Sequence, residues 1–182
     1  HDMRAIMEAM PKERHTLFFS ATISTEIERL IKDFLKDPVR IKVSTRQTAS
    51  NVEQDVIKVP RGGSKIDAHQ TLLKKQEFNK VLVFGRTKHG VEALSKELSA
   101  RGFKAGSIHG NKSQRDRQRS LGLFKDNLIQ VLVATDVAAR GLDIPDVSHV
   151  INFDIPATYD AYIHRIGRTG RGNKQGKALT FV

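Results

Sequence analysis

The sequence predicts an α/β protein with a doubly wound parallel sheet flanked by helices. From residue 52 onward, short apolar runs alternate with longer segments whose apolar residues recur at helical spacing. Two of the runs, Val81–Phe84 and Val131–Ala134, are apolar at every position, which is typical of strands covered on both faces. Strand–helix alternation of this kind predicts a sheet with helices on both faces, which binds ligands at the carboxyl ends of its strands.

Six strands and four helices are predicted in this part of the chain. The strands are expected at 52–59, 80–84, 103–108, 129–134, 149–153 and 177–182. The helices are expected near 66–73, 88–101, 113–124 and 158–166. Ser113 is predicted to cap the third of these helices, with Asp116 three residues later.

The first 43 residues form a separate group of predicted elements. A helical period over residues 3–10 ends at a proline, and a capping box at Thr25–Glu28 begins a second helix. Strands are expected at 16–21, which should be buried, and at 39–43. The chain opens within a helix and without an initiating Met, so we expect a fragment of a larger protein. The polar stretch 44–51 is predicted to be a linker.

The composition indicates a partner rich in phosphate. Lys and Arg number 31 against 20 Asp and Glu, a formal net charge of +11, which favours a nucleic acid over a purely solvated surface. The chain has no cysteine, which excludes disulfides and thiolate metal sites, and its histidines are not at metal-ligand spacing. No apolar span of about 18 residues is present, so we expect a cytoplasmic protein.

The stretch His164–Arg171 is the most unusual in the chain. Its three arginines, 165, 168 and 171, recur at every third position and are predicted to fan out over one surface. Its two glycines allow the backbone to bend and approach a ligand. Guanidinium groups bind phosphate oxygens in a bidentate manner. The alternative is a basic loop that contacts a nucleic-acid backbone or no ligand.

Polar clusters follow three of the predicted strands, namely Gly85–Thr87, His109–Gly110 and Ala134–Asp143. We expect these clusters and the arginine stretch to surround one edge of the sheet. The helix that follows the second cluster begins with the basic segment Lys112–Arg119. Cations at a helix start oppose its dipole, which favours a phosphate partner over the alternative of a solvated charged face.

Several of these segments resemble the successive motifs of the DEAD-box RNA helicases, in the family's order and at its usual intervals. The matching segments are Ser20–Thr22, Val83–Thr87, Gln114 with Arg117, Ala134–Asp143 and His164–Arg171. The resemblance covers the whole chain, and related helicase families usually carry Gln in place of His164. The sequence at residues 86–90 and 109–114 is most similar to that of the bacterial RhlE-type subgroup.

The resemblance implies two RecA-like lobes of the P-loop NTPase type. Residues 1–43 would be the tail of the first lobe, 44–51 the linker, and 52–182 the second lobe. The Walker-type loop and the Asp-Glu-Ala-Asp motif of the first lobe do not occur in this sequence. ATP with Mg²⁺ is the implied cofactor, and the first lobe would hold most of the metal's contacts. We therefore expect this chain to be inactive alone and to need that lobe as its partner.

The resemblance also implies roles for individual residues. Arginine fingers that neutralise transition-state charge would be Arg168 and Arg171, which would also bind the nucleotide together with Gly141 and Asp143. The RNA backbone would contact Arg86, Gly110, Gln114, Arg117 and Thr135. The lobes would be coupled through Ser20, Thr22 and His164. The implied activity is RNA-stimulated ATP hydrolysis that opens RNA duplexes locally or remodels RNA–protein complexes.

Two other functions remain open at this point. The chain could be an RNA-binding module without catalysis, or the lobe of a DNA-directed helicase. A dinucleotide enzyme is disfavoured, because no G-x-G-x-x-G follows a first strand. No membrane partner is expected. For residues 1–43 three arrangements are open, namely packing on the second lobe, exchange with a neighbouring chain, and partial disorder.

Overall fold

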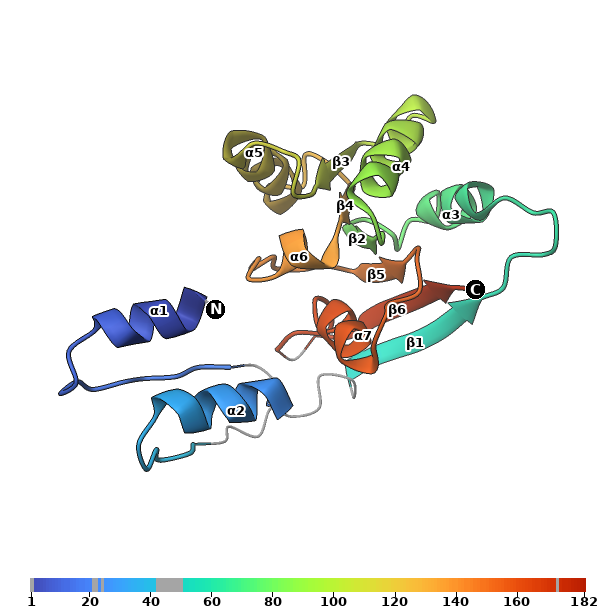
Figure 1. The fold of residues 1–182 in the computed structure, drawn as a ribbon. Helices are drawn as coiled ribbons and strands as arrows, with labels where there is room; N and C mark the ends of the chain where they lie inside the picture. Colours follow the sequence, from blue (N-terminus) through green and yellow to red (C-terminus); the bar gives the residue numbers. More distant parts are fainter. Residues whose placement is uncertain (1, 21–22, 24, 42–50, 173) are drawn as a thin grey trace. The chain divides into compact units, whose positions relative to one another are not determined.

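A computed structural model describes residues 2–20, 23, 25–41, 51–172 and 174–182 (Figure 1). The chain divides into two compact units, His1–Ser44 and Thr45–Val182, which are described separately. The division falls at the start of the predicted linker 44–51, of which only Asn51 belongs to the described residues. Among the described residues, no helix has the length and apolar character needed to cross a bilayer.

The second unit is built on a six-stranded, entirely parallel sheet, which confirms the predicted fold class. Its strand order is β1-β6-β5-β2-β4-β3. The strands are β1 (Val52–Ile57), β2 (Val81–Phe84), β3 (Ala105–Ile108), β4 (Val131–Ala134), β5 (His149–Asn152) and β6 (Gly176–Phe181). All six lie within or close to the predicted ranges.

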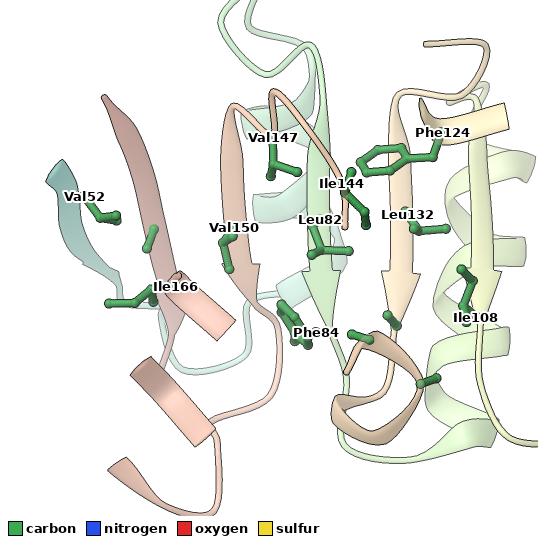
Figure 2. Close-up of a cluster of buried hydrophobic side chains, with 14 residues drawn as sticks. Val52, Leu82, Phe84, Ile108, Phe124, Leu132, Ile144, Val147, Val150 and Ile166 are labelled. Carbon is green, nitrogen blue, oxygen red and sulfur yellow. The ribbon is translucent and has the colours of Figure 1, made fainter. Parts of the chain in front are cut away.

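Both faces of this sheet are covered, as the unbroken apolar runs predict. Alternate side chains of β2 enter two different cores because successive residues of a strand point to opposite faces. Leu82 and Phe84 belong to the core shown in Figure 2, whereas Val81 and Val83 belong to the core on the other face.

Two helices cover one face and three cover the other. Leu73 of α3 (Lys65–Leu73) and Leu94 of α4 (Lys88–Ala100) pack in one core. Phe124 of α5 (Gln114–Lys125), Ala138 of α6 (Asp136–Ala139) and Ile166 of α7 (Tyr159–Ile166) pack in the other. The short helix α6 has no sequence prediction, because one helical turn is too short to show a periodic pattern.

Side-chain caps fix where four of these helices begin. In each case a hydroxyl oxygen accepts a hydrogen bond from the backbone N–H three residues later, which satisfies a donor that the helix leaves free. The four capping residues are Ser64, Thr87, Ser113 and Thr158. The predicted cap at Ser113 is thus confirmed, and the Asp116 carboxylate accepts from the Ser113 hydroxyl at 2.6 Å.

The first unit contains helices α1 (Asp2–Ala9) and α2 (Thr25–Phe34), both close to prediction. The strands predicted at 16–21 and 39–43 are wrong for the residues that the structure describes there, 16–20 and 39–41. Phe19, expected to be buried, is 87% exposed, and Ile41 is also exposed. An apolar run or an apolar alternation makes a strand only beside a partner strand, and no described residue of this unit forms one.

His69 is a buried titratable side chain in the second unit. It lies on α3 between the rings of Phe153 and Phe181, at centroid distances of 5.7 and 6.0 Å. Neither of its ring nitrogens has a hydrogen-bond partner among the described residues. Burial lowers the pKa of His69 to about 4, because the apolar surroundings disfavour the imidazolium.

We expect His69 to make the second unit sensitive to mild acid. Its pKa is lower in the folded than in the unfolded state, so its contribution is fully present above pH 6.5 and is lost as the pH falls toward about 4. Between pH 8 and pH 5 this loss should be about 2 kcal/mol. Urea unfolding at a series of pH values measures it. His69→Leu should flatten the dependence, and an unchanged slope in this variant would contradict the assignment.

Candidate functional site

The arginine stretch begins in α7 and ends in a glycine-rich turn that leads into β6. Gly170 has φ of +64° and Gly172 has φ of +65°. A Cβ on Gly170 would lie 2.7 Å from the Val52 side chain and 2.9 Å from the Asn51 carbonyl oxygen. Only glycine fits this position without displacing β1. Gly167, the other predicted glycine, has φ of −67°, which any residue adopts, and approach of this turn to a ligand stays a prediction.

Arg165 does not share a surface with the other two arginines, contrary to the sequence prediction. It is 2% exposed, because α7 packs on the sheet with Arg165 and the adjacent Ile166 turned inward. Its guanidinium donates to both carboxylate oxygens of Asp136, at 2.6 and 2.8 Å. It also donates to Asn152 Oδ1 at 3.1 Å and to the Asp154 carbonyl at 2.7 Å. Arg165 therefore has a structural position that fixes α7 to the ends of two strands.

Arg168 and Arg171 lie beyond the end of α7 and line a hollow of about 760 Å³, which we call the arginine hollow. Its walls are formed by Asn79, Lys80, Asn127, residues 143–148, residues 168–172, Lys174 and Gln175. Lys80, Ser148 and Gln175 directly precede β2, β5 and β6. The hollow therefore lies beside the amino ends of these strands.

The two arginines of the hollow differ in how firmly they are fixed. Arg168 is half-buried and donates from Nη1 to the Leu142 carbonyl at 2.9 Å. Burial lowers its pKa, and the positive charge of Arg171 adds to this effect. Arg171 donates to the Gly167 carbonyl at 3.0 Å and pairs with Asp143 at 3.1 Å.

The ion pair of Arg171 with Asp143 is open to solvent, because the Asp143 side chain is 87% exposed. Exposed ion pairs of this kind contribute little to stability, so a phosphate can replace Asp143 as the partner of Arg171 at little cost. Gly141 has φ of +71° and no atom within 4 Å of the place where a Cβ would lie. The hollow thus offers guanidinium donors and an exposed carboxylate, which suits an anionic ligand that also carries hydroxyl groups.

The predicted nucleic-acid residues lie at the opposite, carboxyl edge of the sheet. Arg86 follows β2 and its backbone N–H donates to Asp154 at 2.8 Å. Thr135 follows β4 and its N–H donates to the Ile108 carbonyl at 3.3 Å. Gly110 lies two residues after the end of β3. Because these strands are parallel neighbours, the three residues share one edge.

The expectation that the arginine stretch joins the other clusters at this edge is therefore wrong for Arg168 and Arg171. They lie near the amino ends of the strands, because the chain crosses the sheet along α7 before the turn into β6. The structure consequently shows two separate candidate regions, the arginine hollow and the carboxyl edge.

Gln114 and Arg117 begin α5 beside the carboxyl edge. Arg117 Nη1 approaches Gln114 Oε1 at 3.4 Å, and Arg117 Nε is buried without a hydrogen-bond partner among the described residues. His164 is exposed on α7. Ser20 belongs to the first unit, and Thr22 lies outside the described residues. Coupling through Ser20, Thr22 and His164 stays a prediction.

Two residues at the carboxyl edge have no sequence prediction. Glu92 and Lys88 are on α4, and both contact the segment that contains Gly110. In the sequence they look like ordinary solvent-facing charges of an amphipathic helix, and their partners lie 15–23 residues away. No local pattern could have indicated these contacts.

The buried ion pair of Arg165 gives a stability prediction. Asp136→Ala leaves the Arg165 guanidinium buried without its carboxylate, which should cost about 3–5 kcal/mol of unfolding free energy. Arg168→Ala is the matched control, since it removes a half-buried guanidinium with a single carbonyl contact, and should cost about 1 kcal/mol. Urea unfolding at pH 7 measures both. Equal losses of unfolding free energy in the two variants would show that the buried position of Arg165 does not depend on the Asp136 carboxylate.

Comparison with known proteins identifies the conserved domain of this chain. The helicase conserved C-terminal domain matches residues 64–173. These residues include the carboxyl edge and all of the arginine hollow except Lys174 and Gln175. The DEAD-box ATP-dependent RNA helicase CshA of Geobacillus kaustophilus is 47% identical over 182 residues, which are all of this chain and 39% of that protein. The chain therefore spans less than half the length of such relatives.

Solved structures give the same result. A DEAD box protein from the hyperthermophile Methanococcus jannaschii superimposes with a TM-score of 0.68 at 40% identity, covering all of this chain and 48% of that one. Dbp5 of S. cerevisiae, bound to RNA and ADP BeF3, superimposes with a TM-score of 0.82 at 27% identity, over 97% of this chain and 47% of that one. The bacterial RhlE-type subgroup stays a prediction. With this domain, this sheet and these motifs, the chain belongs to the DEAD-box helicase family and contains its conserved C-terminal RecA-like domain.

Proposed function

We propose that this chain is part of an ATP-dependent RNA helicase that couples ATP hydrolysis to local opening of RNA duplexes or remodelling of RNA–protein complexes. The observation that carries the proposal is the arginine hollow, in which Arg168 and Arg171 lie beside the exposed Asp143. In this proposal residues 52–182 are the second RecA-like lobe, 44–51 the linker, and 1–43 the tail of the first lobe, in a cytoplasmic enzyme.

The arginine hollow would supply this lobe's share of the ATP site. Arg168 and Arg171 would contact the phosphates and stabilise the charge that develops during phosphoryl transfer. Asp143, released from Arg171, would accept a hydrogen bond from a ribose hydroxyl, and the open space at Gly141 would admit the nucleotide. The family resemblance implies that Mg²⁺ would be held mainly by the other lobe.

The carboxyl edge would bind the RNA backbone. Its exposed residues Arg86, Gly110, Gln114 and the partly exposed Arg117 and Thr135 offer guanidinium, amide, hydroxyl and backbone donors. Contacts to phosphates and sugars position a strand without reading its sequence, and contacts to 2′-hydroxyls distinguish RNA from DNA. The Dbp5 structure with RNA and ADP BeF3 supports an arrangement in which one enzyme binds both ligands.

The two regions are joined by the segment from Thr135 to Asp143. Its first end lies at the carboxyl edge and is fixed by the Asp136–Arg165 pair, and its second end reaches the hollow, where Arg168 binds the Leu142 carbonyl. A rigid connection of this kind would let closure of the two lobes on ATP bend the bound RNA strand. Because half of the ATP site lies in the other lobe, this chain alone would not hydrolyse ATP.

Removal of a proposed arginine finger should abolish ATP turnover. In the helicase that contains this chain and its ATP-binding lobe, Arg168→Ala should lower RNA-stimulated kcat by about 10³-fold or more, with RNA affinity nearly unchanged. Lys174→Ala is the control, because Lys174 lines the same hollow but is paired with Asp146. Steady-state ATPase assays measure both. Normal turnover in the Arg168 variant would refute the assignment.

Loss of one phosphate contact should change the salt dependence of RNA binding. Arg117→Ala should weaken binding by a similar factor for all sequences and should reduce the slope of log K against log salt by about 1. Lys74→Ala changes the C-cap of α3, a helix on the other face of the sheet from α5, and should leave the slope unchanged. Fluorescence titrations with single-stranded oligoribonucleotides measure this. A loss that depends on sequence would argue against backbone recognition, and equal affinity for deoxyribo-oligonucleotides would favour a DNA-directed helicase.

A further inference from the structure

Glu92 is an acidic side chain placed within the basic surface at the carboxyl edge. It projects from α4 and is 32% exposed. Its Oε2 accepts a hydrogen bond from the Ser107 hydroxyl at 2.7 Å and lies 3.1 Å from His109 Nε2 and 3.3 Å from Lys112 Nζ. Three donors therefore converge on one carboxylate oxygen.

These donors lie in the segment that connects β3 to α5. Ser107 is in β3, His109 directly follows the strand and is buried, and Lys112 precedes the Ser113 cap of α5. Between them the chain makes a turn in which the Lys112 N–H donates to the His109 carbonyl at 3.1 Å. Glu92 thus contacts the segment before, at and after the turn that carries Gly110.

A second side chain of α4 binds the same turn. Lys88 Nζ donates to Asn111 Oδ1 at 3.0 Å. Lys88 and Glu92 are four residues apart and lie on the same side of the helix. A neighbouring side of α4 packs in the core through Val91, Leu94 and Leu98, so these two polar side chains extend from a firmly packed helix.

The negative charge of Glu92 does not by itself favour RNA binding. The hydrogen bond from Ser107, and next that from His109, lower the pKa of Glu92 to about 2, so it is fully charged at neutral pH. A negative charge beside the segment that carries Gly110 repels phosphates. On charge alone, removing it should strengthen RNA binding.

We propose that Glu92 is a positioning residue for RNA binding, which holds the 107–112 segment so that Gly110 and the start of α5 face the RNA backbone. No atom lies within 4 Å of where a Cβ on Gly110 would be, so the space in front of this backbone is open to a ligand. Glu92 itself does not touch RNA. The inference rests on the proposed function, because it takes the carboxyl edge as the RNA-binding region.

The test compares Glu92→Gln with Glu97→Gln in the full 182-residue chain. Both changes remove one negative charge from α4, but Glu97 pairs with Arg101 at 2.7 Å and does not contact the 107–112 segment. Affinity for a single-stranded oligouridine and hydrogen exchange of the amides of residues 109–112 are measured for each. Ser107→Ala removes one donor without any change in charge.

We expect Glu92→Gln to weaken RNA binding about tenfold, since it loses charge-assisted hydrogen bonds that position the segment, and to speed exchange at residues 109–112. Ser107→Ala should change both readouts in the same direction by less. Glu97→Gln should leave exchange unchanged and RNA binding equal or slightly tighter. Urea unfolding confirms that each variant is folded.

Two results would overturn the positioning role, namely RNA binding by Glu92→Gln that equals or exceeds that of the unsubstituted chain, or weaker binding with unchanged exchange at residues 109–112. Failure of the unsubstituted chain to bind RNA would overturn the assignment of the carboxyl edge as an RNA-binding region and, with it, the link between Glu92 and RNA. The exchange data would in that case still show whether Glu92 orders the segment, so the two failures are distinguishable.

Discussion

The burial of the Arg165 guanidinium constrains the rest of this domain. Arginine keeps its charge in proteins, so a guanidinium taken out of water needs oxygen partners on several sides. Here the partners come from the start of α6, the end of β5 and the loop after β5, and the Phe84 ring lies 5.2 Å from the guanidinium carbon. One side chain therefore fixes the positions of α6, α7 and two central strands.

The contacts of Arg165 also help to connect the two candidate regions of this domain. The carboxyl edge and the arginine hollow lie at opposite ends of the strands. The segment from Thr135 to Asp143 crosses between them and is bound near one end by Arg165 of α7 and near the other by Arg168, which lies just beyond that helix. The hollow's own polar pair, Asp143 with Arg171, is left exposed and exchangeable.

The sequence was a good guide wherever local pattern and burial agree. The apolar runs of β2 and β4 predicted covered strands, and the hydroxyl at Ser113 predicted the start of α5, because each depends on neighbours a few residues away. The strands expected at 16–21 and 39–43 failed because neither an apolar run nor apolar alternation shows whether a partner strand is present. The burial of Arg165 and the contacts of Glu92 depend on residues far away in the chain. No local pattern contains that information.

The position of β1 has a consequence for how this unit is made. Among the described strands β1 lies at an edge of the sheet beside β6, and Val52–Ile57 pairs along its length with Gly176–Phe181. Of the six strands of this sheet, β1 is synthesised first and β6 last, with more than a hundred residues between them. Contacts so distant in sequence form slowly. The central strands can pair before synthesis of β6 is complete. The backbone hydrogen-bonding groups of β1 stay unpaired, and exposed to water or to a chaperone, until β6 is available.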